Sequence, residues 1–110
     1  MTRVEVFFAD EKLLGLRIKG HTGFAPQGED LVCAAVSAIA QTAILGLRAF
    51  APDADILQDE ERALIDIGLS REKSDRAQAI LQTALLGLED LAAGMPQYVQ
   101  VLHKKRRWKA

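Results

Sequence analysis

Hydrophobic and polar residues alternate in two short segments at the start of the chain. Residues 4–8 and 14–18 carry an apolar side chain at every second position, which is typical of strands with one buried face. Residues 9–12 between them suit a turn, so the pattern predicts a β-hairpin. Residues 55–58 and 63–68 are expected to form a second strand pair, and 98–102 a last strand.

Two longer segments favour helix. From Asp30 to about Phe50 the chain is rich in alanine and nearly uncharged, and Asp30 is available as N-cap. We expect this segment to be the central buried helix. A second helix is predicted to open at Ser70 and close on Gly94, because Pro96 follows as a further stop signal.

The elements follow one another in the order β-β-α-β-β-α-β. This order predicts an α/β (α+β) fold of two layers, with a small mixed or antiparallel sheet of about five strands and two long helices. At 110 residues one core is expected, formed by a single domain over residues 1–103 and followed by a basic tail at 104–110.

The two helical segments share a short sequence. Residues 41–47 read QTAILGL and residues 82–88 read QTALLGL. A strand–strand–helix unit used twice would explain this similarity, and so would similar packing demands on two helices.

Charge and cysteine content bear on the compartment. The net charge is −1, but five of the 14 basic residues lie in the segment from Lys104 to Lys109. The rest of the chain is therefore acidic. Cys33 is the single cysteine, and the first ten residues lack the apolar run of a signal peptide. A cytoplasmic protein is therefore expected. Residues 31–47 have about the minimum length of a membrane span but carry polar residues in their middle, so we predict no membrane association.

Cys33 is the first candidate for chemistry. A lone cysteine is often a small buried hydrophobe. If Asp30 is the N-cap, however, Cys33 is the third helical residue, where free N–H groups and the helix dipole favour the thiolate. Its side chain would then face the preceding glycine-rich loop, which contains His21.

A pair formed by Cys33 and His21 would support nucleophilic catalysis. The imidazole would take the thiol proton and later protonate the leaving amine, while N–H groups of the first helical turn would bind the oxyanion. His21 could equally be a loop histidine bonded to the main chain. Ser37 lies one turn after Cys33 and either contacts a substrate or bonds back to the carbonyl four residues earlier. The role of Asp30 stays open.

Metal and nucleotide sites are not predicted. Cys33, His21 and His103 include no close ligand pair of the kind that zinc sites use. The segment from Gly15 to Gly20 lacks the pattern of a phosphate-binding loop. We therefore expect no cofactor and no metal.

A longer motif joins these residues. Gly20-His21-Thr22-Gly23 is followed by the run GEDLVCAAVSA over residues 28–38, and together they resemble the signature of the ribosomal-processing cysteine protease family (Prp). The motif combines a G-H-x-G loop with G-[ED]-D-[ILV]-V-C-A-[AG]-[VI]-S, and the similarity extends over nearly the whole chain, except the tail after Leu102.

The resemblance implies a function. Such proteins are small α/β homodimers that remove a short N-terminal extension from a large-subunit ribosomal protein in certain bacteria, cutting next to an aromatic-containing motif. By this similarity Cys33 is the nucleophile and His21 the general base. Asp30, Ser37, Gly20 and Gly23 match further motif positions and are expected to be supporting or substrate-binding residues.

Two other functions are compatible with the residues alone. A non-enzymatic ribosome-associated module would bind through its basic tail and keep Cys33 as inert packing. The tail itself, with Trp108 among its basic residues, would either contact ribosomal RNA weakly or be solvated. A redox-sensing thiol is disfavoured, because the chain has no second cysteine to resolve it.

Overall fold

The computed structural model describes residues 1–20 and 27–104, with side chains described from residue 31 onward in the second range. It contains five strands and two helices in the predicted order. They are β1 (Thr2–Ala9), β2 (Lys12–Lys19), α1 (Gln27–Phe50), β3 (Asp55–Asp59), β4 (Leu64–Gly68), α2 (Asp75–Gly94) and β5 (Val99–Lys104). The predicted fold class and element order are therefore confirmed.

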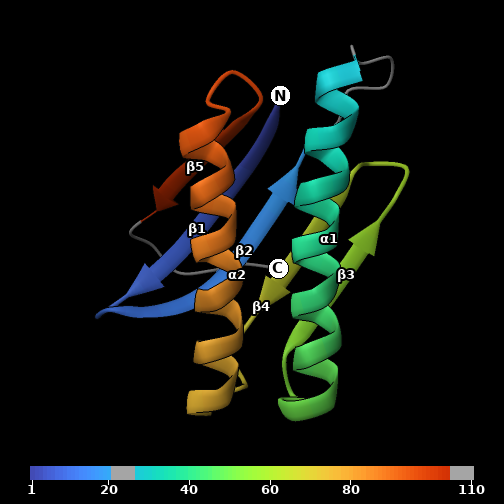
Figure 1. The fold of residues 1–110 in the computed structure, drawn as a ribbon. Helices are drawn as coiled ribbons and strands as arrows, with labels where there is room; N and C mark the ends of the chain where they lie inside the picture. The colour runs from blue at the N-terminus through green and yellow to red at the C-terminus, as the bar shows by residue number, and fades with distance from the viewer. Residues whose placement is uncertain (21–26, 105–110) are drawn as a thin grey trace.

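The strands form one mixed sheet in the order β3-β4-β2-β1-β5 (Figure 1). Neighbouring strands are antiparallel except β1 and β5, which run parallel with Thr2 opposite Val99. The predicted first hairpin turns at Asp10 and Glu11, which both have positive φ, at 50° and 66°. A turn with two positive φ values matches the twist of the strands that it joins.

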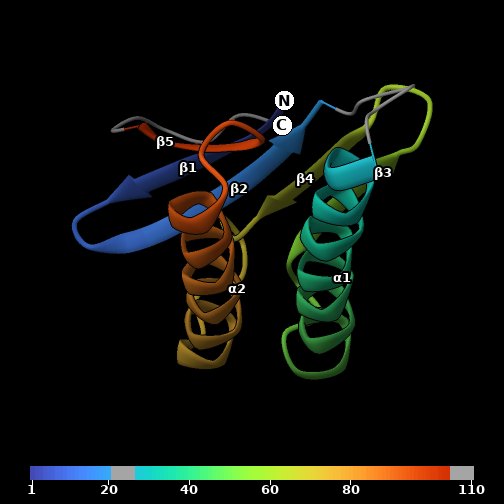
Figure 2. The ribbon, with the colours of Figure 1, turned by 45° about the horizontal axis from the view of Figure 1, so that its top comes forward.

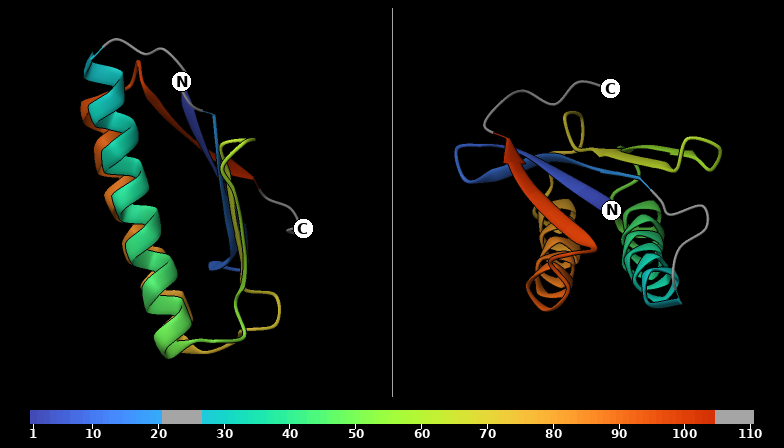
Figure 3. Two further views of the ribbon diagram at one scale, coloured as in Figure 1. Left: turned by 90° about the vertical axis from the view of Figure 1, so that its right-hand side faces the viewer. Right: turned by 90° about the horizontal axis from the view of Figure 1, so that it is seen from above.

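Both helices lie on the same face of the sheet (Figures 2 and 3). The buried side of the sheet and the inner faces of the helices together form one hydrophobic core. Its completely buried large side chains are Val4, Val6, Leu16, Ile44, Leu47, Ile67, Leu81, Leu88 and Val99. The fold thus has two layers, and among the described residues the opposite face of the sheet carries no helix.

Helix α1 differs from the prediction in two ways. It begins at Gln27, about one turn before Asp30, so acidic residues occupy its first turn, where the positive end of the helix dipole favours them. It is also not buried all round, because Leu31 and Leu45 are exposed. The stretch Leu31–Phe50 is long and apolar enough to span a membrane, with a mean hydropathy of 1.7. In this fold, Val36, Ile44 and Leu47 on that stretch pack into the core.

Helix α2 begins later than predicted. Its N-cap is Ser74 rather than Ser70, and the Ser74 hydroxyl accepts a hydrogen bond from the main-chain N–H of Ala77. The carboxylate of Glu72 accepts bonds from the N–H groups of Ser74 and Asp53, which ties the segment before α2 to the residues that follow α1. Hydrogen bonding by Ser74 also holds the pKa of the Glu72 carboxyl below its usual range. The end of the helix at Gly94 is as predicted.

The two ββα halves are related by an approximate twofold arrangement. β2 and β4 pair at the centre of the β3-β4-β2-β1 segment, and α1 and α2 run in opposite directions (Figure 1). A Cβ at Gly46 would lie 3.4 Å from Ile80, and a Cβ at Gly87 would lie 3.4 Å from Ile39. Each helix therefore receives the isoleucine of the other at its glycine. The short sequence shared by the helices serves this reciprocal contact.

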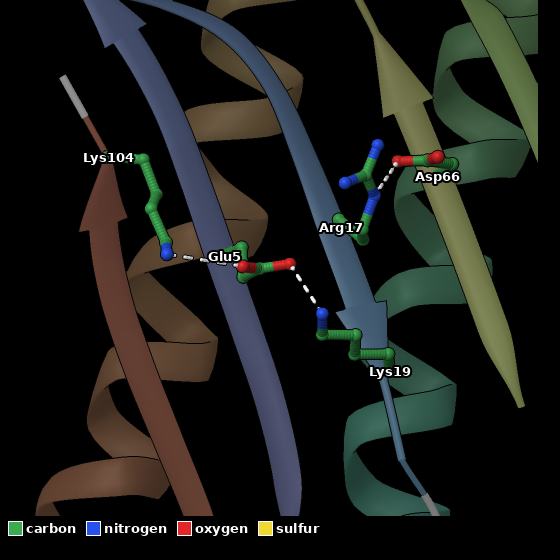
Figure 4. A network of polar contacts seen from close by, with 5 residues as sticks. All are labelled: Glu5, Arg17, Lys19, Asp66 and Lys104. Atoms are coloured by element: carbon green, nitrogen blue, oxygen red, sulfur yellow. Dashed lines mark hydrogen bonds and ion pairs between the residues drawn. The ribbon is translucent and has the colours of Figure 1, made fainter. Parts of the chain in front are cut away.

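The face of the sheet without helices carries a network of ion pairs (Figure 4). Glu5 on β1 lies between Lys19 at 3.2 Å and Lys104 at 3.5 Å, and Arg17 lies 3.1 Å from Asp66. Burial would raise the pKa of the Glu5 carboxyl, but the two ammonium groups hold it below its usual range. Lys104, assigned by sequence to the tail, is the last residue of β5.

Candidate active site

A cavity of about 300 Å³ lies at the end of the molecule where β2 finishes and α1 begins. It is bounded by α1, by the starts of β1 and β4, by the end of β2 and by the β3–β4 turn, which lie at the same end in Figures 1 and 2. The lining residues are Thr2, Ile18, Gly20, Cys33, Val36, Ser37, Gln41, Gln58, Asp59, Glu60, Ala63, Leu64 and Ile65. Three of the residues singled out by sequence therefore meet here: Gly20, Cys33 and Ser37.

Cys33 is half-buried and lines this cavity, so it is not part of the hydrophobic core cluster. The prediction that it is the third helical residue is wrong, because α1 begins at Gln27 and makes Cys33 the seventh. The free N–H groups of a helix belong to its first turn. Those groups therefore cannot supply the stabilisation of the thiolate, or of an oxyanion beside Cys33, that the predicted helix start implied.

Ser37 and Gln41 follow Cys33 at intervals of four residues and lie on the same face of α1. Gln41 donates a hydrogen bond of 2.6 Å to the side chain of Gln58 on β3, and this bond joins α1 to the sheet at the cavity. Thr42 bonds back to the carbonyl four residues earlier at 2.7 Å. Within the described part of the chain, no such bond is found for Ser37, which is exposed to the cavity.

The backbone conformation at position 20 requires a glycine. Its φ is +96°, and a Cβ at this position would lie 2.6 Å from the main-chain oxygen of Met1. Its N–H donates to the carbonyl of Ala63 at 3.2 Å. Glycine alone combines this φ with this close approach. Gly20 consequently fixes the point from which the chain continues to His21.

The remaining predicted site residues lie outside the described part of the structure, either entirely or with their side chains. His21 and Gly23 lie outside the described residues. Asp30 lies in the first turn of α1, and its side chain is outside the described part as well. The distance between the Cys33 sulfur and the His21 ring therefore stays a prediction.

Several cavity residues were missed by sequence reasoning. Thr2 is the clearest, because its hydroxyl lies 3.9 Å from the Cys33 sulfur. The alternation in β1 contains the signal, since Thr2 has the same parity as Val4 and Val6 and must face the helices. Asp59, which pairs with Arg62 at 3.7 Å, and Glu60 place carboxylates on the β3–β4 side of the cavity. Nothing in the local sequence indicates that this turn reaches α1.

Metal binding has no support among the described residues, which contain no group of three or more His, Cys, Asp or Glu side chains placed to hold an ion. The groups at the cavity are a thiol, hydroxyls, amides and carboxylates. This set suits a nucleophile that acts on a peptide held by hydrogen bonds.

Comparison with known proteins identifies the family. The family model described as "Cysteine protease Prp" matches residues 1–100. The chain belongs to the Prp family of cysteine proteases. The ribosomal processing cysteine protease Prp of Bacillus subtilis is 32% identical over 87 residues, which cover 74% of this chain and 78% of that protein. The Prp of Staphylococcus aureus is 31% identical over 108 residues, which cover 94% of this chain and all of that protein.

The fold agrees with a solved Prp structure. The S. aureus ribosomal processing protease Prp in complex with a substrate peptide has a TM-score of 0.87, with 25% identity over 94% of this chain and 100% of that chain. The chain is therefore a cysteine protease of the Prp family, and the non-enzymatic alternative is not favoured. Cys33, as its single cysteine, is the candidate nucleophile.

Proposed function

We propose that this Prp-family protease removes a short N-terminal extension from a bacterial large-subunit ribosomal protein, with Cys33 as nucleophile and His21 as general base. The observation that carries the proposal is that Cys33 and Gly20, the residue before His21, line one cavity. The named relatives are ribosomal processing proteases, and one of them is described with a substrate peptide.

The proposed chemistry is acyl transfer in two steps. The His21 imidazole takes the thiol proton, and the Cys33 thiolate attacks the peptide carbonyl to form a tetrahedral intermediate. The imidazolium then protonates the leaving amine as the C–N bond breaks, and water hydrolyses the remaining thioester. Ser37, which is exposed to the cavity, is proposed to contact the substrate, and Asp30 and Gly23 are proposed to be supporting residues.

The cavity wall also bears on the substrate. Asp59 and Glu60 supply carboxylates to the described lining, which contains no Lys or Arg. The Asp59 carboxylate is paired with the guanidinium of Arg62 at 3.7 Å, so the negative charge of this wall rests on Glu60. An acidic wall favours a peptide with basic residues near the cut. A protein that contacts RNA phosphates does so through Lys and Arg, so the sign of the charge agrees with a substrate that binds RNA.

The direct test is to incubate the purified protein with the ribosomal protein precursor of the same organism and to measure product masses. We expect one product, shorter by the N-terminal extension, and no further cleavage of the mature protein. The matched control is a precursor whose aromatic residues near the cut are replaced by alanine. If the protein does not cut the natural precursor although its thiol is alkylated at the normal rate, this substrate assignment is contradicted.

We also propose that the protein is a homodimer that pairs through the outer faces of its helices. An apolar groove of about 610 Å³ runs between α1 and α2 on the side away from the sheet, and Ile39, Ile80 and Phe50 are among its lining residues. Leu45 and Leu86 beside it are 66% and 67% exposed. The approximate twofold relation of the helices suits a self-complementary contact.

Light scattering after gel filtration tests the dimer. The double substitution Leu45→Glu and Leu86→Glu is expected to halve the measured mass, because four carboxylates would be placed in a twofold apolar interface. Leu57→Glu is the matched control, since Leu57 is 51% exposed on β3 and lies on the other side of the sheet. A wild-type protein of monomer mass would refute this part of the proposal.

Two further expectations complete the proposed role. We propose that the protein acts in the cytoplasm, where a ribosomal precursor is available and a single thiol stays reduced. The weak ribosomal RNA contact through the basic tail stays a prediction, because residues 105–110 lie outside the described residues.

A further inference from the structure

Thr2 is a buried polar residue at the start of β1. It is only 3% exposed, and its Oγ1 lies 3.9 Å from the Sγ of Cys33. The two residues are 31 positions apart, so the contact is made by the tertiary fold. Thr2 lines the same cavity as Cys33.

The main chain holds Thr2 firmly in place. Its N–H donates to the carbonyl of Tyr98 at 2.9 Å, and Thr2 pairs with Val99 in the parallel ladder of β1 and β5. The hydroxyl therefore projects from a strand inside the sheet, whereas the sulfur projects from α1. A donor mounted on a rigid strand restricts the positions of the sulfur that it contacts.

Because the Thr2 hydroxyl is buried, a hydrogen bond to the Cys33 sulfur is energetically favourable. A buried hydroxyl without a partner is costly, and the sulfur is within hydrogen-bond distance for this atom type. A hydroxyl can donate to a thiolate, and a hydrogen bond to the charged form of a group favours that form. This donor does not depend on the helix terminus, which lies almost two turns before Cys33.

We propose that Thr2 is a positioning residue for the nucleophile: its hydroxyl donates a hydrogen bond to the Cys33 thiolate, stabilises the ionised sulfur and holds it at the cavity. The hydroxyl keeps its own proton throughout and transfers none to the substrate. The catalytic meaning of this contact rests on the proposed protease mechanism, but the contact itself can be tested without any substrate.

The test compares wild type with Thr2→Val, which removes the hydroxyl and keeps the branched shape. The rate of alkylation of Cys33 by iodoacetamide is measured by mass spectrometry from pH 5 to pH 10, with no peptide present. The pH of half-maximal alkylation is expected to rise by about one unit, the effect of losing one hydrogen bond to a charged group. Thr2→Ser is expected to return it close to the wild-type value.

Thr83→Val is the matched control, because the Thr83 hydroxyl donates to the carbonyl of Ala79 on α2 and lines the groove between the helices rather than the cavity of Cys33, with gel filtration as the check that the oligomeric state is unchanged. Its alkylation profile should coincide with that of wild type. Thr2→Ala provides a second variant should the valine protein fold poorly, with circular dichroism as the check on both. An unchanged alkylation midpoint in a folded Thr2 variant would overturn the proposal.

Peptide cleavage separates this inference from the protease proposal. If Thr2 acts through ionisation of the sulfur, Thr2→Val lowers kcat/KM about tenfold below the wild-type midpoint, and the deficit disappears at pH values above the shifted midpoint. If neither the wild-type protein nor any variant cleaves the peptide, the proposed function is contradicted. The alkylation midpoints would still decide the role of Thr2.

Discussion

Cys33→Ala is expected to lower the rate of peptide cleavage by at least about a thousandfold, since removal of a covalent nucleophile leaves only binding and electrostatic effects. The fold should survive, because Cys33 is half-buried at a cavity and is not a member of the core cluster. Cleavage is measured by the mass of the shortened precursor, and folding by the melting temperature. Residual cleavage near the wild-type rate would exclude a thiol mechanism.

Two companion variants sharpen this result. Cys33→Ser keeps the shape of the side chain and replaces the thiol by a much weaker acid, so it should be almost as inactive as the alanine variant. His21→Ala should also lose most activity while Cys33 can still be alkylated at high pH. Full activity in His21→Ala would assign the general base to another residue and would leave the nucleophile unaffected.

Gly20→Ala is the second large effect that we expect, with a loss of about a hundredfold in kcat/KM. The added Cβ would approach the Met1 carbonyl oxygen to 2.6 Å, and its φ of +96° is unfavourable for alanine. Relief of this contact must move the end of β2 or the start of β1, and with them His21 or Thr2. Misplacement of catalytic groups by about 1 Å is sufficient for such a loss.

Gly94→Ala is the control for this prediction. A Cβ at Gly94 meets no atom within 4 Å, and Gly94 is the last residue of α2 and does not line the cavity. Activity should be unchanged and stability equal or slightly higher, because alanine favours helix over glycine. Melting temperature and kcat/KM are measured for both variants. Equal activity of Gly20→Ala and wild type would show that the conformation of Gly20 does not position the site.

The fold followed from local patterns to a large extent. The alternation in residues 4–8 and 14–18 and the stop after Gly94 have local causes. These are strand pleating and Pro96, which disfavours the helical conformation at Met95. The helix starts did not follow. At α2, the carboxylate of Glu72 accepts hydrogen bonds from the N–H groups of Ser74 and Asp53, so the segment before the helix is held by a distant part of the chain. A contact across 19 residues is not visible in the local sequence.

The residues of the site also fall into two groups, those whose position follows from local spacing and those that only strand pairing brings to the cavity. Cys33 and Ser37 share a face because their helical spacing demands it, and the motif around them indicates the family. Thr2, Gln58 and the acidic β3–β4 turn reach the same cavity only through strand pairing. Sheet order depends on how all the hydrophobic faces are buried together, which no short segment specifies.

The order of the elements, the family and the identity of the single thiol can be inferred from residue type and short-range spacing. The position of the thiol in the second turn of α1, its contact with the hydroxyl of Thr2 and the close approach of Gly20 to Met1 can be seen only in the folded chain. The physical reason is that a helix start and a buried contact depend on distant partners, because burial and hydrogen bonding act through space rather than along the chain.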